Sequence, residues 1–297
     1  MGITCGVPQG SILGPLLFLI YFNDFENCLN NSRTLMFADD TVVYVEGKKK
    51  EDIEKLLNND LQRTSSYFQT NQLVINLKKG KTESMVFGTA KRLSSCGKKL
   101  TLYFNEKEIQ TTETYKYLGT TLDSTLSFAT NFDHMYKKTM SKLRKLFSLR
   151  AYLDKTSKIK IFKGMILPLI KYNCTTNLNL NQTQKKKMET IDRLTTRITD
   201  TQQTPTENEL KKHAIILVRK CIDKNTCENF RDYFKIQSHN QQTRNNGHLI
   251  QIPRTKLNFA KSGFFSAGAT LYNHLPLEIR KIENFNVFRK NVFKLYM

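Results

Sequence analysis

Two adjacent aspartates interrupt a stretch that otherwise reads as paired β-strands, in the segment FADDTVVYVEG at residues 37–47. Residues 35–38 and 41–45 on either side are apolar, β-branched or aromatic. Only Asp39 and Asp40 separate them, and two residues are the length of a tight hairpin loop. The sequence therefore predicts an antiparallel hairpin with both carboxylates at its tip.

The aspartate pair is a costly choice for such a loop. Aspartate is a common turn residue because its side chain bonds its own backbone, but the favoured two-residue loops carry glycine at a central position, and this loop has none. Two like charges about 4 Å apart repel by roughly 4 kcal/mol at a surface-like dielectric constant of about 20. We therefore expect a cation to offset this repulsion.

The charge of the whole chain points to an anionic partner. Lysine and arginine number 47 against 26 aspartates and glutamates, which gives a formal net charge of +21. A polyanion such as a nucleic acid is the expected partner for this excess. A membrane is a weaker candidate, because the longest apolar run, residues 12–22, is shorter than the roughly 20 residues a spanning helix needs. No signal peptide pattern begins the chain.

The six cysteines do not form the pattern of a disulfide scaffold, because they are few and scattered along 297 residues. A reducing compartment is the expected environment. Cys221 and Cys227, with His213 and His239 nearby, could be imagined as a zinc site. Their spacing, however, exceeds the usual two to four or so residues between ligand cysteines.

Hydrophobic periodicity divides the chain near residue 127. Before it, the pattern predicts a helix capped by Ser11, the acidic hairpin, an amphipathic helix from Glu51 and short strands at residues 84–87, 100–105 and 115–118, with a basic loop at 88–99. These elements would form one sheet backed by two helices. The fold class expected is α+β.

Beyond residue 127 the period is helical throughout. Three apolar stripes predict helices around residues 128–147, 159–170 and 188–198, and a fourth helix is expected to begin with Pro205 in its first turn. Residues 237–263 are polar and read as a linker, and residues 276–297 as a basic helix. The domains expected are therefore 1–125, 126–236 and 237–297.

Three motifs in order resemble the reverse transcriptase of non-LTR (LINE-type) retrotransposons, from its motif B onward. They are GVPQGSILGPLL from Gly6, FADD from Phe37, and Tyr117-Leu118-Gly119 after a strand. Residues 71–83, with Lys81, resemble motif D, and residues 117–128 resemble motif E, the primer grip. The resemblance implies a partial polymerase palm (antiparallel sheet with helices), then an all-helical thumb and a C-terminal helical tail.

The resemblance also implies a chemistry: two-metal nucleotidyl transfer. Asp39 and Asp40 would be Mg²⁺ ligands, since hard cations prefer carboxylate oxygens. Lys81 would act as a cation near the triphosphate. Two further groups would contact the substrates: Gln9 and Gly10 line the nucleotide and template side, and Tyr117, Leu118 and Gly119 hold the primer end. The partners implied are an RNA template, a DNA primer and deoxynucleoside triphosphates.

The family's metal site needs a further aspartate on a strand upstream of motif B, and this sequence begins five residues before Gly6. We therefore expect a truncated RNA-directed DNA polymerase, inactive alone because this aspartate and the fingers are missing. A non-catalytic nucleic-acid-binding protein derived from a retroelement is the alternative. A third possibility is that a missing N-terminal half on a second polypeptide completes the enzyme. A nuclear and cytoplasmic ribonucleoprotein is the expected location.

Overall fold

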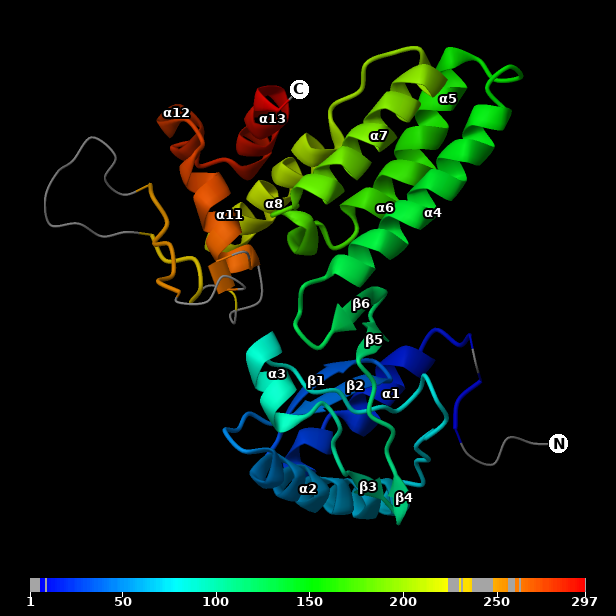
Figure 1. The fold of residues 1–297 in the computed structure, drawn as a ribbon, viewed down its shortest axis with the longest axis vertical. Helices are drawn as coiled ribbons and strands as arrows, with labels where there is room; N and C mark the ends of the chain where they lie inside the picture. Colours follow the sequence, from blue (N-terminus) through cyan, green and yellow to red (C-terminus); the bar gives the residue numbers. More distant parts are fainter. Residues whose placement is uncertain are drawn as a thin grey trace, which may run out of the picture. The chain divides into compact units, whose positions relative to one another are not determined.

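The structure, a computed structural model, describes residues 6–8, 10–223, 230, 232–236, 248–255, 260–261 and 263–296. The chain divides into two compact units, Met1–Ser127 and Phe128–Met297 (Figure 1). The first combines helices with small antiparallel sheets, and the helices of the second are the bundle drawn in green to red. The α+β class is confirmed. Within the described residues, no helix is both long and apolar enough to cross a bilayer.

The acidic hairpin forms, with its loop one residue earlier than predicted. Strand β1 (Arg33–Phe37) pairs antiparallel with β2 (Asp40–Tyr44), and Phe37 lies opposite Asp40. The two loop residues are therefore Ala38 and Asp39, and Asp40 begins the second strand. The prediction of an Asp39-Asp40 loop was wrong because apolar flanks fix where strands run but not their register. Ala38 makes the turn with a φ of +52°.

Two helices and a short 3₁₀ turn surround this hairpin in the sequence. Helix α1 (Gly14–Phe22) begins after Ser11, whose Oγ accepts a hydrogen bond from the Gly14 amide at 3.0 Å. The 3₁₀ helix η1 (Phe25–Cys28) follows, and after the hairpin comes α2 (Lys50–Thr70). The N-cap position of α1 is Leu13 and not Ser11, although the Ser11 side chain accepts from the first amide of the helix. The amphipathic helix near Glu51 is confirmed. Helix α2 packs Leu57, Leu61 and Phe68 against a small core.

The single sheet predicted for the first unit is wrong. Within the part of the unit that the structure describes, the strands pair as three separate two-stranded sheets: β1–β2, β3 (Tyr103–Phe104) with β4 (Lys107–Glu108), and β5 (Thr114–Tyr117) with β6 (Thr120–Asp123). Side chains of α2 take the place of a neighbouring strand: Asn58 accepts from the Tyr103 amide at 2.9 Å, and Glu54 from the Thr101 amide at 2.7 Å.

Residues 84–99 also differ from the prediction. Instead of a strand at 84–87, only Ser84 pairs, through an isolated bridge to Thr111. The loop predicted at 88–99 contains helix α3 (Ala90–Cys96), because Thr89 caps it by accepting from the Arg92 amide and Leu93 is buried.

The second unit begins with the helices that the apolar stripes predict. They are α4 (Ala129–Ser148), α5 (Lys155–Ile161), the π-helical turn η2 (Phe162–Ile166), α6 (Leu167–Lys171), the 3₁₀ helix η3 (Cys174–Asn177) and α7 (Gln182–Thr199). The wide turn η2 precedes Pro168, which has no N–H with which to continue an α-helix. The stripes pack together in one core that contains Phe132, Ile170 and Ile191.

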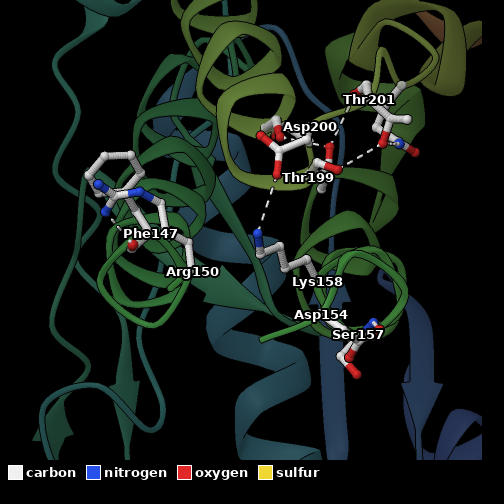
Figure 2. Close-up of polar contacts among 10 residues, drawn as sticks. Phe147, Arg150, Asp154, Ser157, Lys158, Thr199, Asp200 and Thr201 are labelled. Carbon is white, nitrogen blue, oxygen red and sulfur yellow. Dashed lines mark hydrogen bonds and ion pairs between the residues drawn. The ribbon is translucent and has the colours of Figure 1, made fainter. Parts of the chain in front are cut away.

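Polar contacts fix one end of this helical bundle (Figure 2). Asp154 caps α5 by accepting from the Ser157 amide at 3.1 Å. Lys158 forms an ion pair with Asp200 at 3.3 Å, at the point where α7 ends. The Arg150 guanidinium lies 3.7 Å from the centre of the Phe147 ring. The Asp154 cap fixes the start of α5, and the ion pair from Lys158 to Asp200 holds α5 beside the end of α7.

The C-terminal helices build a second core in this unit. Helix α8 (Thr206–Ile222) follows Pro205, which is its N-cap and not part of its first turn. The last helices are α11 (Phe264–Asn273), α12 (Leu277–Arg280) and α13 (Phe285–Leu295), so the basic helix predicted over 276–297 is two helices. They pack with α8 around Val218 and Phe288. Most of the predicted linker at 237–263 lies outside the described residues.

Candidate active site

The two aspartates lie at an exposed hairpin tip. Asp39 is in the loop and Asp40 is the first residue of β2, and both are exposed. Ala38 beside them has a left-handed backbone, which alanine adopts only at an energetic cost. In the described part of the chain no lysine or arginine forms an ion pair with either carboxylate. The cation expected to offset their repulsion is therefore not a nearby protein side chain of this part.

The predicted primer-grip residues form a second hairpin tip in the same unit. Leu118 and Gly119 are the two loop residues between β5 and β6, since Tyr117 lies opposite Thr120. Their φ angles are +44° and +80°, as a type I′ turn requires. Glycine adopts this conformation freely, but a leucine there is strained.

Asp40 lies near the second hairpin. Burial, and then the negative charge of Asp40, raise the pKa of the Tyr117 hydroxyl. The same two causes, followed by the charge of Glu83, raise the pKa of Tyr115. A carboxylate has this effect only at short range, because dissolved salt screens exposed charges beyond about 10 Å at 0.1 M ionic strength. Asp40 therefore lies within this range of both β5 tyrosines.

Tyr115 connects the lysine motif to the same place. Its hydroxyl donates a hydrogen bond of 2.7 Å to the backbone carbonyl of Lys81. The loop around Lys81 is itself ordered by Glu83, whose carboxylate accepts from the Gly80 amide at 2.8 Å. The Lys81 side chain is exposed. Tyr115 thus connects the Lys81 loop to β5, the strand that ends at Tyr117, and it lies in the field of the Asp40 charge.

The loop predicted to contact the nucleotide stands apart from this group. Gln9 lies outside the described residues. Gly10 is exposed with a φ of +89°, and a side chain built on it would meet no atom within 4 Å. A left-handed glycine in open surroundings fits a loop that another molecule approaches closely. The structure does not bring Gly10 against either hairpin.

Asp60 is a positioning residue that the sequence analysis did not identify. It is 1% exposed, and its carboxylate accepts from the amides of Asn30, Asn31 and Ser32 at 3.1, 2.9 and 2.7 Å and from the Asn31 side chain at 3.1 Å. Burial would raise the pKa of Asp60, but these hydrogen bonds outweigh it and lower the pKa. Residues 30–32 lead into β1, so Asp60 fixes where the acidic hairpin begins.

The sequence contained a signal for Asp60. It lies between Leu57 and Leu61, on the face of the amphipathic helix α2 that packs inward. An acidic residue on an apolar face is almost never buried without partners. Asp24, by contrast, accepts from the Tyr67 hydroxyl at 2.5 Å, which is a contact within the scaffold.

The aspartate pair fits a divalent cation only in part. Carboxylate oxygens are the ligands Mg²⁺ prefers, and both side chains are exposed and unpaired with protein cations in the described part of the chain. Among the described residues, however, no three histidine, cysteine, aspartate or glutamate side chains gather into a metal site. Asp39 and Asp40 can therefore supply some ligands of a metal centre.

An apolar surface is exposed on the same unit. The exposed residues lie on α1 and β1 and in the turn before α1. They include Ile12, Leu13, Leu16, Leu19, Ile20, Leu35 and Phe37. A soluble monomer rarely leaves so many large apolar side chains of neighbouring segments in water.

Comparison with known proteins shows which family most of the first unit resembles. Residues 2–122 match the family model described as reverse transcriptase (RNA-dependent DNA polymerase). This range includes the acidic hairpin, Asp60, Lys81 and the turn between β5 and β6. Residues 2–122 are therefore similar to reverse transcriptases, as the motifs predicted.

More than half of the chain is similar to transposon polymerases. The probable RNA-directed DNA polymerase from transposon X-element of Drosophila melanogaster is 28% identical over 179 residues, covering 58% of this chain and 19% of the relative. The RNA-directed DNA polymerase from mobile element jockey of Drosophila funebris is 29% identical over 180 residues, covering 57% and 19%.

A third relative is the retrovirus-related Pol polyprotein from type-1 retrotransposable element R1 2 of Nasonia vitripennis, 24% identical over 176 residues, covering 56% of this chain and 42% of the relative. The chain thus spans about a fifth of the length of the first two relatives. No solved structure matches. The matched part of the chain is therefore similar to retrotransposon RNA-directed DNA polymerases.

Proposed function

We propose that the first unit is part of the polymerase centre of a non-LTR retrotransposon reverse transcriptase, its palm, with Asp39 and Asp40 as Mg²⁺ ligands. The observation that carries this proposal is the hydrogen bond from the Tyr115 hydroxyl to the Lys81 carbonyl, which joins β5, the strand that ends at Tyr117, to the lysine loop. The charge of Asp40 also reaches Tyr115 and Tyr117, because it raises the pKa of both hydroxyls. A structural turn would have no need of an acidic tip, a lysine loop and a strained hairpin in one place.

The residues of this chain have distinct roles in the proposed reaction. Divalent ions, when bound, activate the primer 3′-hydroxyl and hold the triphosphate. Asp39 and Asp40 hold the ions, and Lys81 lies beside the triphosphate, where its ammonium group can protonate the leaving pyrophosphate. Tyr117, Leu118 and Gly119 hold the primer end. Gln9 and Gly10 line the template and nucleotide side.

The proposed centre needs at least one more carboxylate than this pair, supplied from outside the described residues, for instance by an N-terminal half of the polymerase. We therefore expect no primer extension by the isolated chain with Mg²⁺ or Mn²⁺. Robust Mg²⁺-dependent DNA synthesis on an RNA template, abolished by Asp39→Ala, would refute the need for a further ligand.

A metal titration tests the site without requiring activity. Mn²⁺ bound at the tip would broaden the NMR amide signals of the β1–β2 loop, and Asp39→Asn and Asp40→Asn should each weaken this effect. Glu106→Gln removes a charge from the exposed β3–β4 loop and serves as the matched control. Equal Mn²⁺ affinity in all three variants would contradict the assignment of Asp39 and Asp40 as metal ligands.

A second candidate function, nucleic-acid binding without catalysis, is favoured by the surface of the second unit, which we propose to be the thumb. Exposed basic residues lie along α4 and α7: Lys137, Lys138, Arg144, Lys145, Lys185, Lys186, Arg193 and Arg197. Such side chains contact phosphates without reading sequence. Duplex binding that falls steeply with salt and survives Asp39→Ala is the result expected. Affinity indifferent to salt would exclude it.

The partners proposed are an RNA template, a DNA primer and deoxynucleoside triphosphates, in a ribonucleoprotein of the nucleus and cytoplasm. Fractionation of cells expressing the tagged chain tests this location. If the chain were recovered without bound RNA from both the nuclear and the cytoplasmic fraction, the proposed ribonucleoprotein would be contradicted.

A further inference from the structure

A cluster of aromatic rings lies at the beginning of α11 in the second unit, far in the sequence from the reverse transcriptase match. The Tyr233 ring stacks on Phe265 with centroids 4.0 Å apart and planes 15° from parallel. Phe230 and Phe234 lie 6.3 and 5.6 Å from the same Phe265 ring, and Phe264 lies 5.8 Å from it. The cluster therefore has Phe265 at its centre.

The cluster is built in layers, from a buried anchor to an exposed edge. Phe234 is 3% exposed and belongs to the C-terminal core, whereas Tyr233 is 51% and Phe230 44% exposed. Tyr233 already covers one of its faces with Phe265. Its exposure therefore leaves ring surface on the outside of the stack.

The backbone that carries Tyr233 is held in place from two sides. The backbone carbonyl of Lys235 accepts a hydrogen bond from the Gln251 amide at 2.8 Å, and Ile236 pairs with Ile250 through an isolated β-bridge. Asn273 of α11 in turn grips Ile250, accepting from its amide at 2.9 Å and donating to its carbonyl at 2.8 Å. A ring held in this way loses little conformational entropy when it binds a partner.

The charges nearby indicate what the ring would bind. Exposed cations flank the cluster along the chain at Lys235, Arg254 and Lys261, and the one acidic neighbour in residues 232–236 is Asp232, 3.9 Å from the Lys235 amine. Aromatic rings beside cations match an unpaired nucleotide, whose base stacks while its phosphate meets the positive charge. A duplex does not fit, because its bases already stack on each other. An uncharged apolar protein surface would leave the cations without a role.

We propose that Tyr233, stacked on Phe265, is a platform for an unpaired base of single-stranded nucleic acid. The proposal goes beyond the polymerase function, since it needs neither aspartate of the acidic hairpin and no metal. RNA and DNA share the stacking chemistry, and the test separates them.

The chain contains no tryptophan, which makes a direct test possible. Tyr233→Trp in the full-length chain places a single fluorescent reporter in the stack, and Tyr152→Trp places one at a tyrosine that is 86% exposed in the same unit. Each is titrated with single-stranded RNA and single-stranded DNA of about 12 nucleotides, a length within known single-strand site sizes, and with a duplex of the same length. EDTA and raised salt suppress metal and phosphate contributions.

The expected result is saturable quenching of the reporter at position 233 by a single strand and not by duplex, with no such quenching of the reporter at position 152. The RNA and DNA arms then assign the strand. Quenching equal at both positions, or by duplex alone, would overturn the proposal.

Affinity measurements with other variants separate stacking from simple apolar docking. Tyr233→Leu keeps an apolar side chain but removes the ring, and it should weaken single-strand binding roughly tenfold, while Tyr233→Phe binds normally. Tyr152→Leu is the control. Circular dichroism verifies folding of each variant. If Tyr233→Leu and the unchanged chain bind single strands with equal affinity, the proposal is overturned. This outcome does not depend on whether Asp39 and Asp40 bind Mn²⁺.

Discussion

Replacing Asp60 by asparagine tests how the acidic hairpin is held. Each carboxylate oxygen accepts two hydrogen bonds, so the amide oxygen of asparagine keeps two donors and its NH₂ group faces the other two. A buried donor left without a partner costs about 1–3 kcal/mol. These donors are partly buried, and we therefore expect a loss of about 2–4 kcal/mol in the free energy of unfolding, a large part of the roughly 5–15 kcal/mol of a typical domain.

The assay is urea unfolding of the full chain, combined with hydrogen exchange at the amides of residues 30–32. Exchange there should accelerate in Asp60→Asn, whereas Asp52→Asn, an exposed change in the first turn of the same helix, should leave it unchanged. If the two variants differ by less than about 0.5 kcal/mol, within the usual range of surface substitutions, the reasoning is refuted.

The same residue predicts a pH dependence. The pKa of Asp60 is lower in the folded protein than its ordinary value. Its contribution to stability is therefore complete above the unfolded value of about 3.9 and is lost as the pH falls from there toward the folded value. Asp60→Asn should flatten this part of the stability curve.

Three further changes test other parts of the structure. Asp40→Asn removes a charge that raises the pKa of the two β5 tyrosines, so their absorbance titration should shift to lower pH, and Asp39→Asn should leave it unchanged. Leu118→Gly relieves a left-handed leucine, and thermal unfolding should show a gain of about 1 kcal/mol; a loss would contradict the strain. Lys212→Met removes a buried amine 2.5 Å from Glu209, and chemical unfolding should show a loss of about 2–4 kcal/mol; an unchanged midpoint would contradict it.

Local sequence patterns predicted the helices well, because an amphipathic stripe records which face is buried. The stripes of α2, α4 and α7 are examples of features that depend on residues close in the chain. The pairing of strands could not be predicted in this way, since Asn58 and Glu54 satisfy backbone groups some 45 residues away. A pattern of neighbouring residues cannot show that side chains of a distant helix will bond a strand's backbone in place of another strand.

The candidate site likewise combines features that depend on neighbouring residues with features that depend on distant ones. Asp39, Asp40, Lys81 and the Tyr117–Gly119 turn were found from short motifs, because each motif is contiguous. Tyr115 was missed as a connector, since its role is a hydrogen bond to the Lys81 backbone carbonyl and leaves no trace in the identity of Lys81. The offset of the hairpin loop by one residue has a similar cause, because Ala38 gives no sign in the sequence of its left-handed backbone.

Helix α8 contributes to both cores of the second unit. Leu210, near its start, belongs to the core of the helical bundle, and Ile215, Val218 and Cys221 belong to the C-terminal core. A chain cut between α8 and α11 would thus leave part of the C-terminal core on each fragment. The two fragments would be expected to associate and restore the native contacts, so this unit is a natural candidate for fragment complementation, with α8 as the helix that joins its two parts.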